Sequence, residues 1–186
     1  MNTDRKLYQS IAGLAFITGV ILLIPLIAMQ YTGEVNWDLA DFIVMGTLIF
    51  GTGLTYKLIT RKSGETKYRV AIGFALAIGF FLIWANLAVG IIGSENNPIN
   101  LVYFGVLAVG IIAAFIARFQ SHKMAIVMFA MAIALALVAV SAVIAGMHSS
   151  PGSSLPEIMG VNGFFILMCV ISALLFRHAA QDQVKP

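Results

Sequence analysis

Charged residues are scarce in this chain of 186 residues, and their scarcity excludes an ordinary soluble fold. Only 10% of the residues are Asp, Glu, Lys or Arg and 60% are hydrophobic, whereas an average soluble domain carries about 25% charged residues. The single cysteine, Cys169, excludes a disulfide framework. Because a transmembrane helix needs roughly 20 apolar residues, six of them fill roughly 120 residues and leave no room for a soluble catalytic domain.

Six apolar stretches predict an all-α integral membrane protein with six transmembrane helices. The expected spans are Leu7–Tyr31, Asp38–Thr60, Arg69–Gly93, Pro98–Phe119, Met124–Met147 and Leu155–His178. The first follows a short charged segment, as a signal peptide does, but lacks a cleavage-site pattern and is interpreted as an uncleaved span. Short connections predict antiparallel hairpins over residues 7–60, 69–119 and 124–178, within a single transmembrane domain covering residues 1–186.

The positive charges lie near the two ends of the chain and near every second connection, and not near the other connections. All eleven Lys and Arg residues can be placed on one side of a membrane, and these are Arg5, Lys6, Lys57, Arg61, Lys62, Lys67, Arg69, Arg118, Lys123, Arg177 and Lys185. Since cytoplasmic loops are rich in Lys and Arg, this predicts a multi-pass protein of a bacterial inner membrane with both termini in the cytoplasm. The basic residues then act as anchors in the lipid bilayer, and no nucleic acid partner is predicted.

Acidic residues fall on the other side, where the even-numbered spans begin with a shared polar pattern. A capping residue stands three positions before a second polar residue in Asp38-x-x-Asp41, Asn97-x-x-Asn100 and Ser154-x-x-Glu157. Because this is capping-box spacing, Asp38, Asp41, Asn97, Ser154 and Glu157 are predicted to be helix caps rather than an ion site. The recurring pattern also predicts that the three hairpins are tandem repeats in one orientation.

Two polar or amphipathic residues of the third span break this repeat. Trp84 and Asn86 lie in an apolar helix, well below the expected outer interface. A side-chain amide in hydrocarbon is unfavourable unless it finds a hydrogen-bond partner. Asn86 is therefore expected either to hold two helices together or to line a cavity that opens outward, and the sequence leaves both interpretations open.

The connection after this span is the most polar one on the outer side. If Asn97 caps the following helix, Glu95 and Asn96 are not needed as caps. One explanation for them is that they belong to a loop that is simply exposed to solvent. The other is that they form a substrate-binding site together with Trp84, Asn86 and Tyr103.

In the first span, Pro25 cannot donate a backbone hydrogen bond to Ile21. It therefore predicts a helix kink at that position.

The absence of charge at mid-span counts against a proton relay or a voltage sensor. His122 and His178 are expected on the cytoplasmic side and His148 on the outer side, so they form no cluster, and no metal site or other cofactor is predicted. No catalytic set of residues is recognisable, so an enzyme is not predicted.

The leading prediction is a small carrier or channel with an outward-facing polar pocket for a small molecule or ion. The alternative is a non-transporting membrane scaffold or stress-response subunit. Small residues spaced four apart favour close helix packing, within the chain or in a homo-oligomer.

The segment from Trp84 to Pro98, with the sequence WANLAVGIIGSENNP, resembles one in small uncharacterised six-helix bacterial inner-membrane proteins. The resemblance implies no activity. The three-hairpin plan is also similar, in layout alone, to that of the bacterial acid-resistance membrane proteins.

Overall fold

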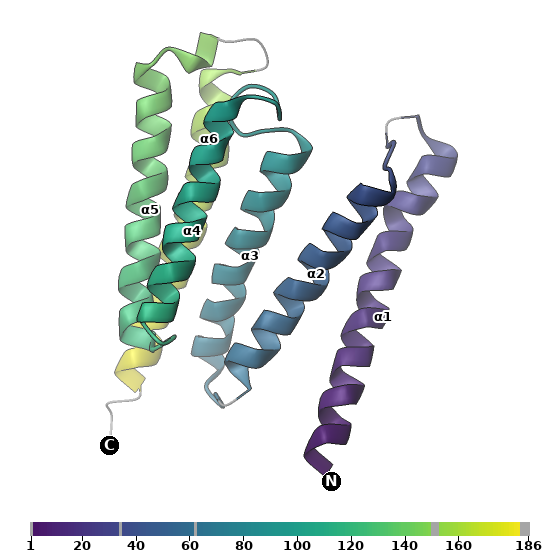
Figure 1. Ribbon diagram of the computed structural model, residues 1–186. Coiled ribbons are helices and arrows are strands. Elements are labelled where there is room, and N and C mark those ends of the chain that lie inside the picture. The colour runs from purple at the N-terminus through teal and green to yellow at the C-terminus, as the bar shows by residue number, and fades with distance from the viewer. Residues whose placement is uncertain (1, 34, 62, 150–152, 183–186) are drawn as a thin grey trace. The chain divides into compact units, whose positions relative to one another are not determined.

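The computed structural model describes residues 2–33, 35–61, 63–149 and 153–182, and for residues 2–7 it describes the backbone alone. The expected charges at Glu34, Lys62 and Lys185, and the side chains of Arg5 and Lys6, lie outside this part. The described residues form helices, turns and loops without a strand (Figure 1). The elements are α1 (Asn2–Tyr31), α2 (Leu39–Thr60), α3 (Thr66–Ala88), η1 (Pro98–Asn100), α4 (Leu101–Ile116), α5 (Ser121–Ile144), η2 (Met147–Ser149) and α6 (Leu155–Asp182).

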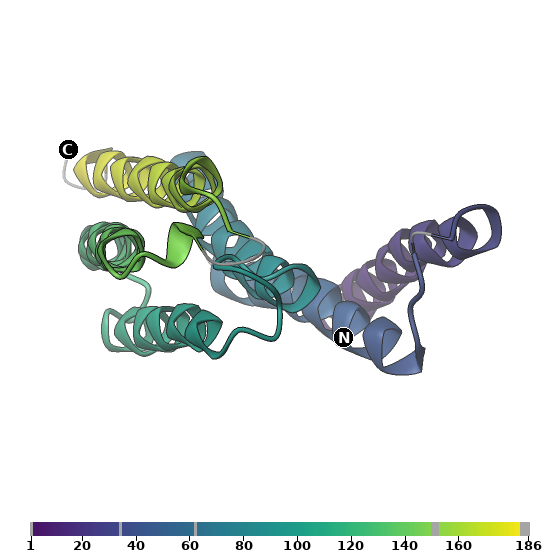
Figure 2. The same cartoon turned by 90° about the horizontal axis from the view of Figure 1, so that it is seen from above.

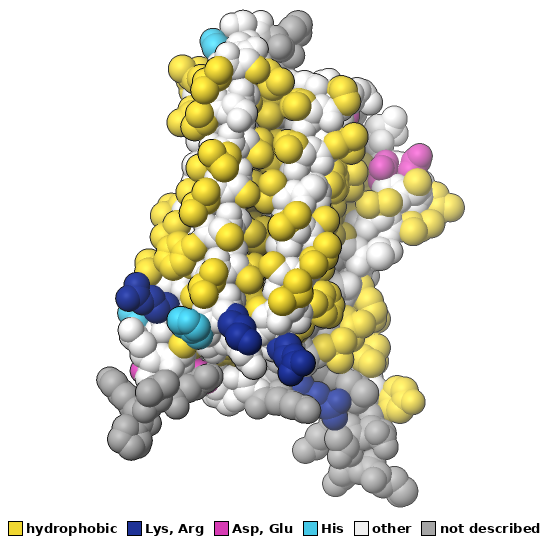
Figure 3. All heavy atoms as spheres, turned by 60° about the vertical axis from the view of Figure 1, so that its left-hand side comes forward, with side chains coloured by type: hydrophobic (Ala, Val, Ile, Leu, Met, Phe, Trp, Pro, Cys, Tyr) yellow, Lys and Arg dark blue, Asp and Glu magenta, His cyan; other side chains and the backbone are white. Residues whose placement is uncertain are grey.

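Among the described residues, six helical segments are long and apolar enough to cross a membrane. They are Tyr8–Tyr31, Leu39–Thr60, Thr66–Ala88, Pro98–Ile116, Ser121–Ile144 and Leu155–Asp182. Large apolar side chains such as Val109 and Ile116 are exposed, and hydrophobic surface extends over the face drawn in Figure 3. An exposed apolar surface of this extent suits helices that face lipid rather than water. The prediction of an all-helical protein with six apolar spans is thus confirmed.

The chain divides into two compact units, residues 1–61 and residues 62–186. The first unit is a pair of helices, α1 and α2. They approach closely at Gly53, where an added side-chain carbon would lie 2.5 Å from Cδ1 of Leu14. One turn further along α2, Nζ of Lys57 donates to the carbonyl oxygen of Ser10 (2.7 Å) and to its Oγ (2.6 Å). These contacts hold α1 against α2.

Pro25 lies inside α1, and the kink predicted there stays a prediction. The two aspartates of the first unit form the cap that their spacing predicts. Asp38 is the N-cap residue of α2: its Oδ1 accepts from the backbone N–H of Asp41, and Oδ2 of Asp41 accepts from that of Asp38, both at 2.9 Å. This reciprocal pair is a capping box, which satisfies two N–H groups that the helix leaves unpaired.

Helix α6 is the central element of the second unit. It packs most extensively on α5 and next on α3, while α4 packs against α5. Viewed from above, α6, α5 and α4 lie in a row, with α3 beside α6 (Figure 2). Contact between α3 and α4 is slight, so the expected hairpin over residues 69–119 is not a tightly packed pair. Its connection, residues 89–97, is long enough for α6 to become the principal neighbour of α3.

Three contacts at one end of the second unit show that α3 and α6 run antiparallel. Lys67 forms an ion pair with Asp182. The rings of Tyr68 and Phe176 meet edge to face, with 5.7 Å between their centroids. One turn further along α3, Oγ of Ser172 donates to the carbonyl oxygen of Ala71 (3.0 Å). The start of α3 and the end of α6 therefore lie together, at what is called below the basic end.

Helices α4 and α5 join at the same end through a turn with unusual backbone angles. Arg118 and Phe119 both have positive φ, 51° and 55°, which ends α4 and reverses the chain. The hydroxyl group of Tyr68 donates to the carbonyl oxygen of Phe119 (2.9 Å) and so ties the turn to α3. The predicted span to Phe119 is shortened for this reason, since left-handed residues cannot continue an α-helix.

The Y68F substitution is expected to loosen this end of the second unit. It removes the hydroxyl group that pairs with the Phe119 carbonyl but keeps the ring against Phe176, so the free energy of unfolding should fall by about 1 kcal/mol. Thermal unfolding in detergent micelles, followed by circular dichroism, measures the change. The control is Y31F, because Tyr31 is 85% exposed. An equal effect of both substitutions would contradict the proposed tie.

Candidate functional site: a buried polar cluster

The end of α3 is set by a glycine that adopts a backbone conformation unfavourable for other residues. Gly90 has φ of +74°, and its N–H donates to the carbonyl oxygen of Ala85 (2.9 Å). A left-handed glycine just after the last turn is a common way to close a helix. Helix α3 therefore ends at Ala88, five residues before the predicted end at Gly93, and the chain turns into the polar loop of residues 89–97.

Asn100 organises this loop from the inside. It is 4% exposed, and its Oδ1 accepts from the backbone N–H groups of Ile92 (2.9 Å) and Ile91 (3.2 Å). Its Nδ2 donates to the carbonyl oxygens of Ser94 (2.9 Å) and Ile92 (3.3 Å). The expected capping box between Asn97 and Asn100 is therefore not formed. Asn100 instead satisfies backbone groups that a buried turn would otherwise leave unpaired.

Asn97 and Ser154 do act as caps. Oδ1 of Asn97 accepts from the backbone N–H of Ile99 (3.2 Å) at the start of η1. Oγ of Ser154 accepts from the N–H of Glu157 (3.3 Å), which lies in the first turn of α6. The two connections also meet, because the N–H of Gly93 donates to Oγ of Ser153 (2.6 Å). This hydrogen bond places the loop after α3 beside the start of α6.

Below the loop, Tyr103 of α4 reaches α6. Its side chain is fully buried, and its hydroxyl group donates to Oδ1 of Asn162 (3.1 Å). Nδ2 of Asn162 donates in turn to the carbonyl oxygen of Ile158, one turn earlier in α6 (2.9 Å). Both polar side chains are thereby satisfied within an otherwise apolar interior, as buried polar groups generally are.

Asn86 has the same local arrangement as Asn162 but only half of its hydrogen bonds. Its Nδ2 donates to the carbonyl oxygen of Leu82, one turn earlier in α3 (2.6 Å). Its Oδ1 is buried and has no hydrogen-bond partner, although the residue is only 4% exposed. An unpaired buried acceptor is unfavourable by about 1–3 kcal/mol, so helix packing alone does not explain this oxygen.

Asn86 lies on the face of α3 that packs against α6. Spacings of three and four residues along α3 connect it through the buried Leu82 and Ile78 to Ala71, which contacts Ser172 of α6. In an antiparallel pair with this register, Asn86 lies near the level of Ile158, about one helical turn from Asn162. Asn86, Tyr103 and Asn162, from α3, α4 and α6, are called the polar cluster below.

The other residues expected in the site lie elsewhere. Trp84 is 41% exposed and its ring faces Phe81, with 6.1 Å between the centroids. Two residues along a helix correspond to a rotation of about 200°, so Trp84 and Asn86 lie on different faces of α3. Glu95 and Asn96 are exposed and bond to each other, Nδ2 to Oε1 at 3.0 Å. The structure does not bring these three side chains into the polar cluster.

The sequence interpretation missed Asn162 and assigned Asn100 to a cap rather than to the loop that it organises. Asn162 is an isolated amide in the apolar sixth span, which is the same signal that singled out Asn86. Asn100 has the spacing of a cap, and nothing local distinguishes a cap from a residue that folds back onto a loop. No group of three or more His, Cys, Asp or Glu that could hold a metal ion occurs among the described residues.

Within the part of the chain that the structure describes, six helices are suited to crossing a membrane. Tyr103 and Asn162 form a buried hydrogen-bonded pair between two of them, and the register of α3 on α6 places the buried Asn86 about one turn from Asn162. No protein-family model, curated protein or solved structure was found to match the chain. The resemblance of the Trp84–Pro98 segment to uncharacterised inner-membrane proteins therefore stays a prediction.

Proposed function

We propose that this chain is a small multi-pass carrier or channel of a bacterial inner membrane, and that Asn86 contacts its ligand. The observation that carries the proposal is the unpaired, buried Oδ1 of Asn86. An amide oxygen accepts a hydrogen bond from a neutral donor or coordinates a cation weakly. The ligand is accordingly a small, uncharged hydrogen-bond donor or a single cation, because no acidic side chain belongs to the cluster.

The proposed orientation places both termini in the cytoplasm. Within the second unit, five Lys and Arg residues lie at the basic end, and these are Lys67, Arg69, Arg118, Lys123 and Arg177. The opposite end carries Glu95 and Glu157. This separation supports a cytoplasmic basic end by the positive-inside rule. The polar cluster then lies nearer the outer surface, where the proposed pocket would open.

A non-transporting scaffold or stress-response subunit is the second candidate, and the closure of the cluster favours it. Tyr103 and Asn162 are fully buried and Asn86 nearly so. A solute can reach Asn86 only if α3 and α6 separate at the end near Gly93. In a scaffold, the same amides would serve to hold helices together.

Matched leucine substitutions at the two asparagines separate these functions. N86L removes an acceptor that has no partner, so a ligand-binding role predicts unchanged or slightly higher stability of the ligand-free protein. N162L leaves the Tyr103 hydroxyl group unpaired and is expected to lower the free energy of unfolding by about 1–3 kcal/mol. Thermal unfolding in detergent micelles measures both. Equal destabilisation by the two substitutions would indicate that Asn86 only packs helices.

A further inference from the structure

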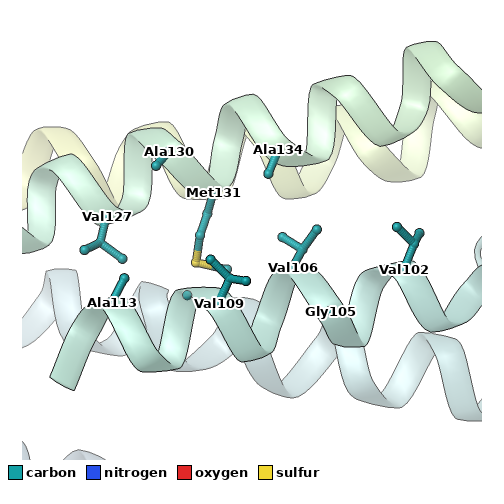
Figure 4. A pocket seen from close by; sticks show the side chains of 10 residues that line it. Val102, Gly105, Val106, Val109, Ala113, Val127, Ala130, Met131 and Ala134 are labelled. Carbon is teal, nitrogen blue, oxygen red and sulfur yellow. The ribbon is translucent and has the colours of Figure 1, made fainter. Parts of the chain in front are cut away.

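A hollow on the surface of the second unit lies between α4 and α5. Its volume is about 390 Å³, and it is lined by apolar side chains and glycine: Val102, Gly105, Val106, Val109, Gly110, Ala113, Val127, Ala130, Met131 and Ala134. Figure 4 shows side chains of the two helices facing each other across it, with Met131 reaching from α5 toward α4. Small residues on both walls leave the space open, and the hollow lies within two candidate membrane spans.

One end of this hollow leads toward the basic end of the unit. Ala113 precedes Arg118 by five residues, and Val127 follows Lys123 by four. At 1.5 Å per residue, the four residues on α5 correspond to about 6 Å, and Arg118 lies two residues beyond the end of α4 at Ile116. The apolar part of an Arg or Lys side chain can extend over such a distance while its charged group stays at the membrane surface.

Arg118 and Lys123 flank the turn that joins the two walls of the hollow. Both side chains are exposed, and neither makes an ion pair with another described residue, in contrast to Lys67, which pairs with Asp182. Figure 3 shows Lys and Arg side chains in a row at the lower edge of the hydrophobic surface. The left-handed backbone at Arg118 and Phe119 and the hydrogen bond from Tyr68 fix the geometry of this turn.

We infer that the hollow binds one acyl chain of an anionic phospholipid whose phosphate is held by Arg118 and Lys123. The apolar walls match a hydrocarbon chain, and the two cations match a phosphate at the level of the headgroups. A neutral lipid would leave the two cations without a partner. This inference is independent of the function proposed for Asn86.

Lipid binding to the full chain tests the inference. The chain is purified in a non-ionic detergent and titrated with dioleoyl phosphatidylglycerol or dioleoyl phosphatidylcholine, and bound lipids are counted by native mass spectrometry. We expect phosphatidylglycerol to bind more tightly. The pair R118Q and K123Q should weaken its binding about thirtyfold and leave phosphatidylcholine binding unchanged. Inorganic phosphate at millimolar concentration should not displace the lipid, because it lacks the acyl chain.

Two matched controls distinguish binding at this site from a general electrostatic attraction between the basic end and anionic lipid. R69Q with R177Q removes two exposed charges at the same end but on α3 and α6, and should leave phosphatidylglycerol affinity within about twofold. G105L fills the hollow and should reduce the affinity severalfold, whereas G160L adds the same side chain at an exposed position of α6. Neither glycine has a neighbouring atom within 4 Å of an added side-chain carbon. If G105L fails to fold, A130L fills the hollow from the α5 side.

Three results would overturn the inference. The first is equal affinity for the two lipids. The second is equal weakening by the α3–α6 and α4–α5 charge pairs. The third is unchanged lipid binding in both hollow-filling variants. If light scattering also showed that the protein is a dimer and that these variants are monomers, the occupant of the hollow would be a second copy of the chain.

Discussion

The G90A substitution is expected to lower the free energy of unfolding by about 2–5 kcal/mol, one of the two largest effects foreseen for a single substitution in this chain. Gly90 has φ of +74°, which disfavours a residue with a side chain by about 1–2 kcal/mol. The added methyl carbon would also lie 2.5 Å from the carbonyl oxygen of Ser94 and 2.8 Å from Nδ2 of Asn100. Overpacking a filled site contributes about 1–3 kcal/mol more.

The matched control for this substitution is G146A. Gly146 has nearly the same backbone angle, φ of +72°, but nothing lies within 4 Å of an added side-chain carbon. It should therefore show only the conformational part of the effect, about 1–2 kcal/mol. Chemical or thermal unfolding in detergent micelles measures both variants. Equal losses would mean that the loop of residues 89–97 is not packed around Asn100 as described.

The N100A substitution is the second change expected to have a large effect, about 2–5 kcal/mol of unfolding free energy. It removes four hydrogen bonds at once and leaves the buried N–H groups of Ile91 and Ile92 without an acceptor. The loop would lose the side chain around which it folds. The start of α4 and the polar cluster beneath should then become more accessible to solvent, which amide hydrogen exchange at Ile91 and Ile92 would show.

Two neighbouring asparagines give a graded comparison for N100A. N97A removes one side-chain hydrogen bond to Ile92 and one to Ile99 from a half-buried residue, so about 1 kcal/mol is expected. N96A removes one exposed hydrogen bond to Glu95, so a change within about 0.5 kcal/mol is expected. An order other than Asn100, Asn97, Asn96 in the measured losses would contradict the assigned roles.

Composition and spacing were sufficient to predict the helices and most of the local caps. Apolar stretches of membrane-spanning length set the six segments, and Asp38 with Asp41 forms the reciprocal pair that its spacing indicates. Local rules work here because both features depend on residues close together in sequence. The end of α3 was placed too late because two glycines, Gly90 and Gly93, both have positive φ in the structure, and the sequence does not show which one ends the helix.

The packing order and the composition of the site depended on contacts between distant residues. Nothing in the sequence placed α6 rather than α4 beside α3, so the partner of Tyr103 was not foreseen. The separation of Trp84 from Asn86, in contrast, follows from helical geometry alone, since two residues along a helix point to different faces. The isolated amide of Asn162 was also visible in the sixth span. The sequence left open whether Asn86 joins two helices or lines a cavity, and its unpaired oxygen required the structure.

Water access to position 86 tests the proposed function most directly. Cysteine replaces Asn86 in a C169A background, and intact membranes are treated from outside with a membrane-impermeant thiol reagent. Cysteine at position 96, on the exposed loop, is the positive control. Cysteine at position 137 is the control for lipid exposure, because Leu137 is 61% exposed about two turns before the end of α5 at Ile144. A polar reagent should not reach it within a bilayer.

If the protein is a carrier or channel with a pocket at Asn86, we expect labelling at positions 86 and 96 and none at position 137. Position 86 should react more slowly than position 96, because α3 and α6 must separate first. Labelling at position 96 alone would contradict the account. It would show that the unpaired oxygen of Asn86 stays sealed from water, as expected of a scaffold.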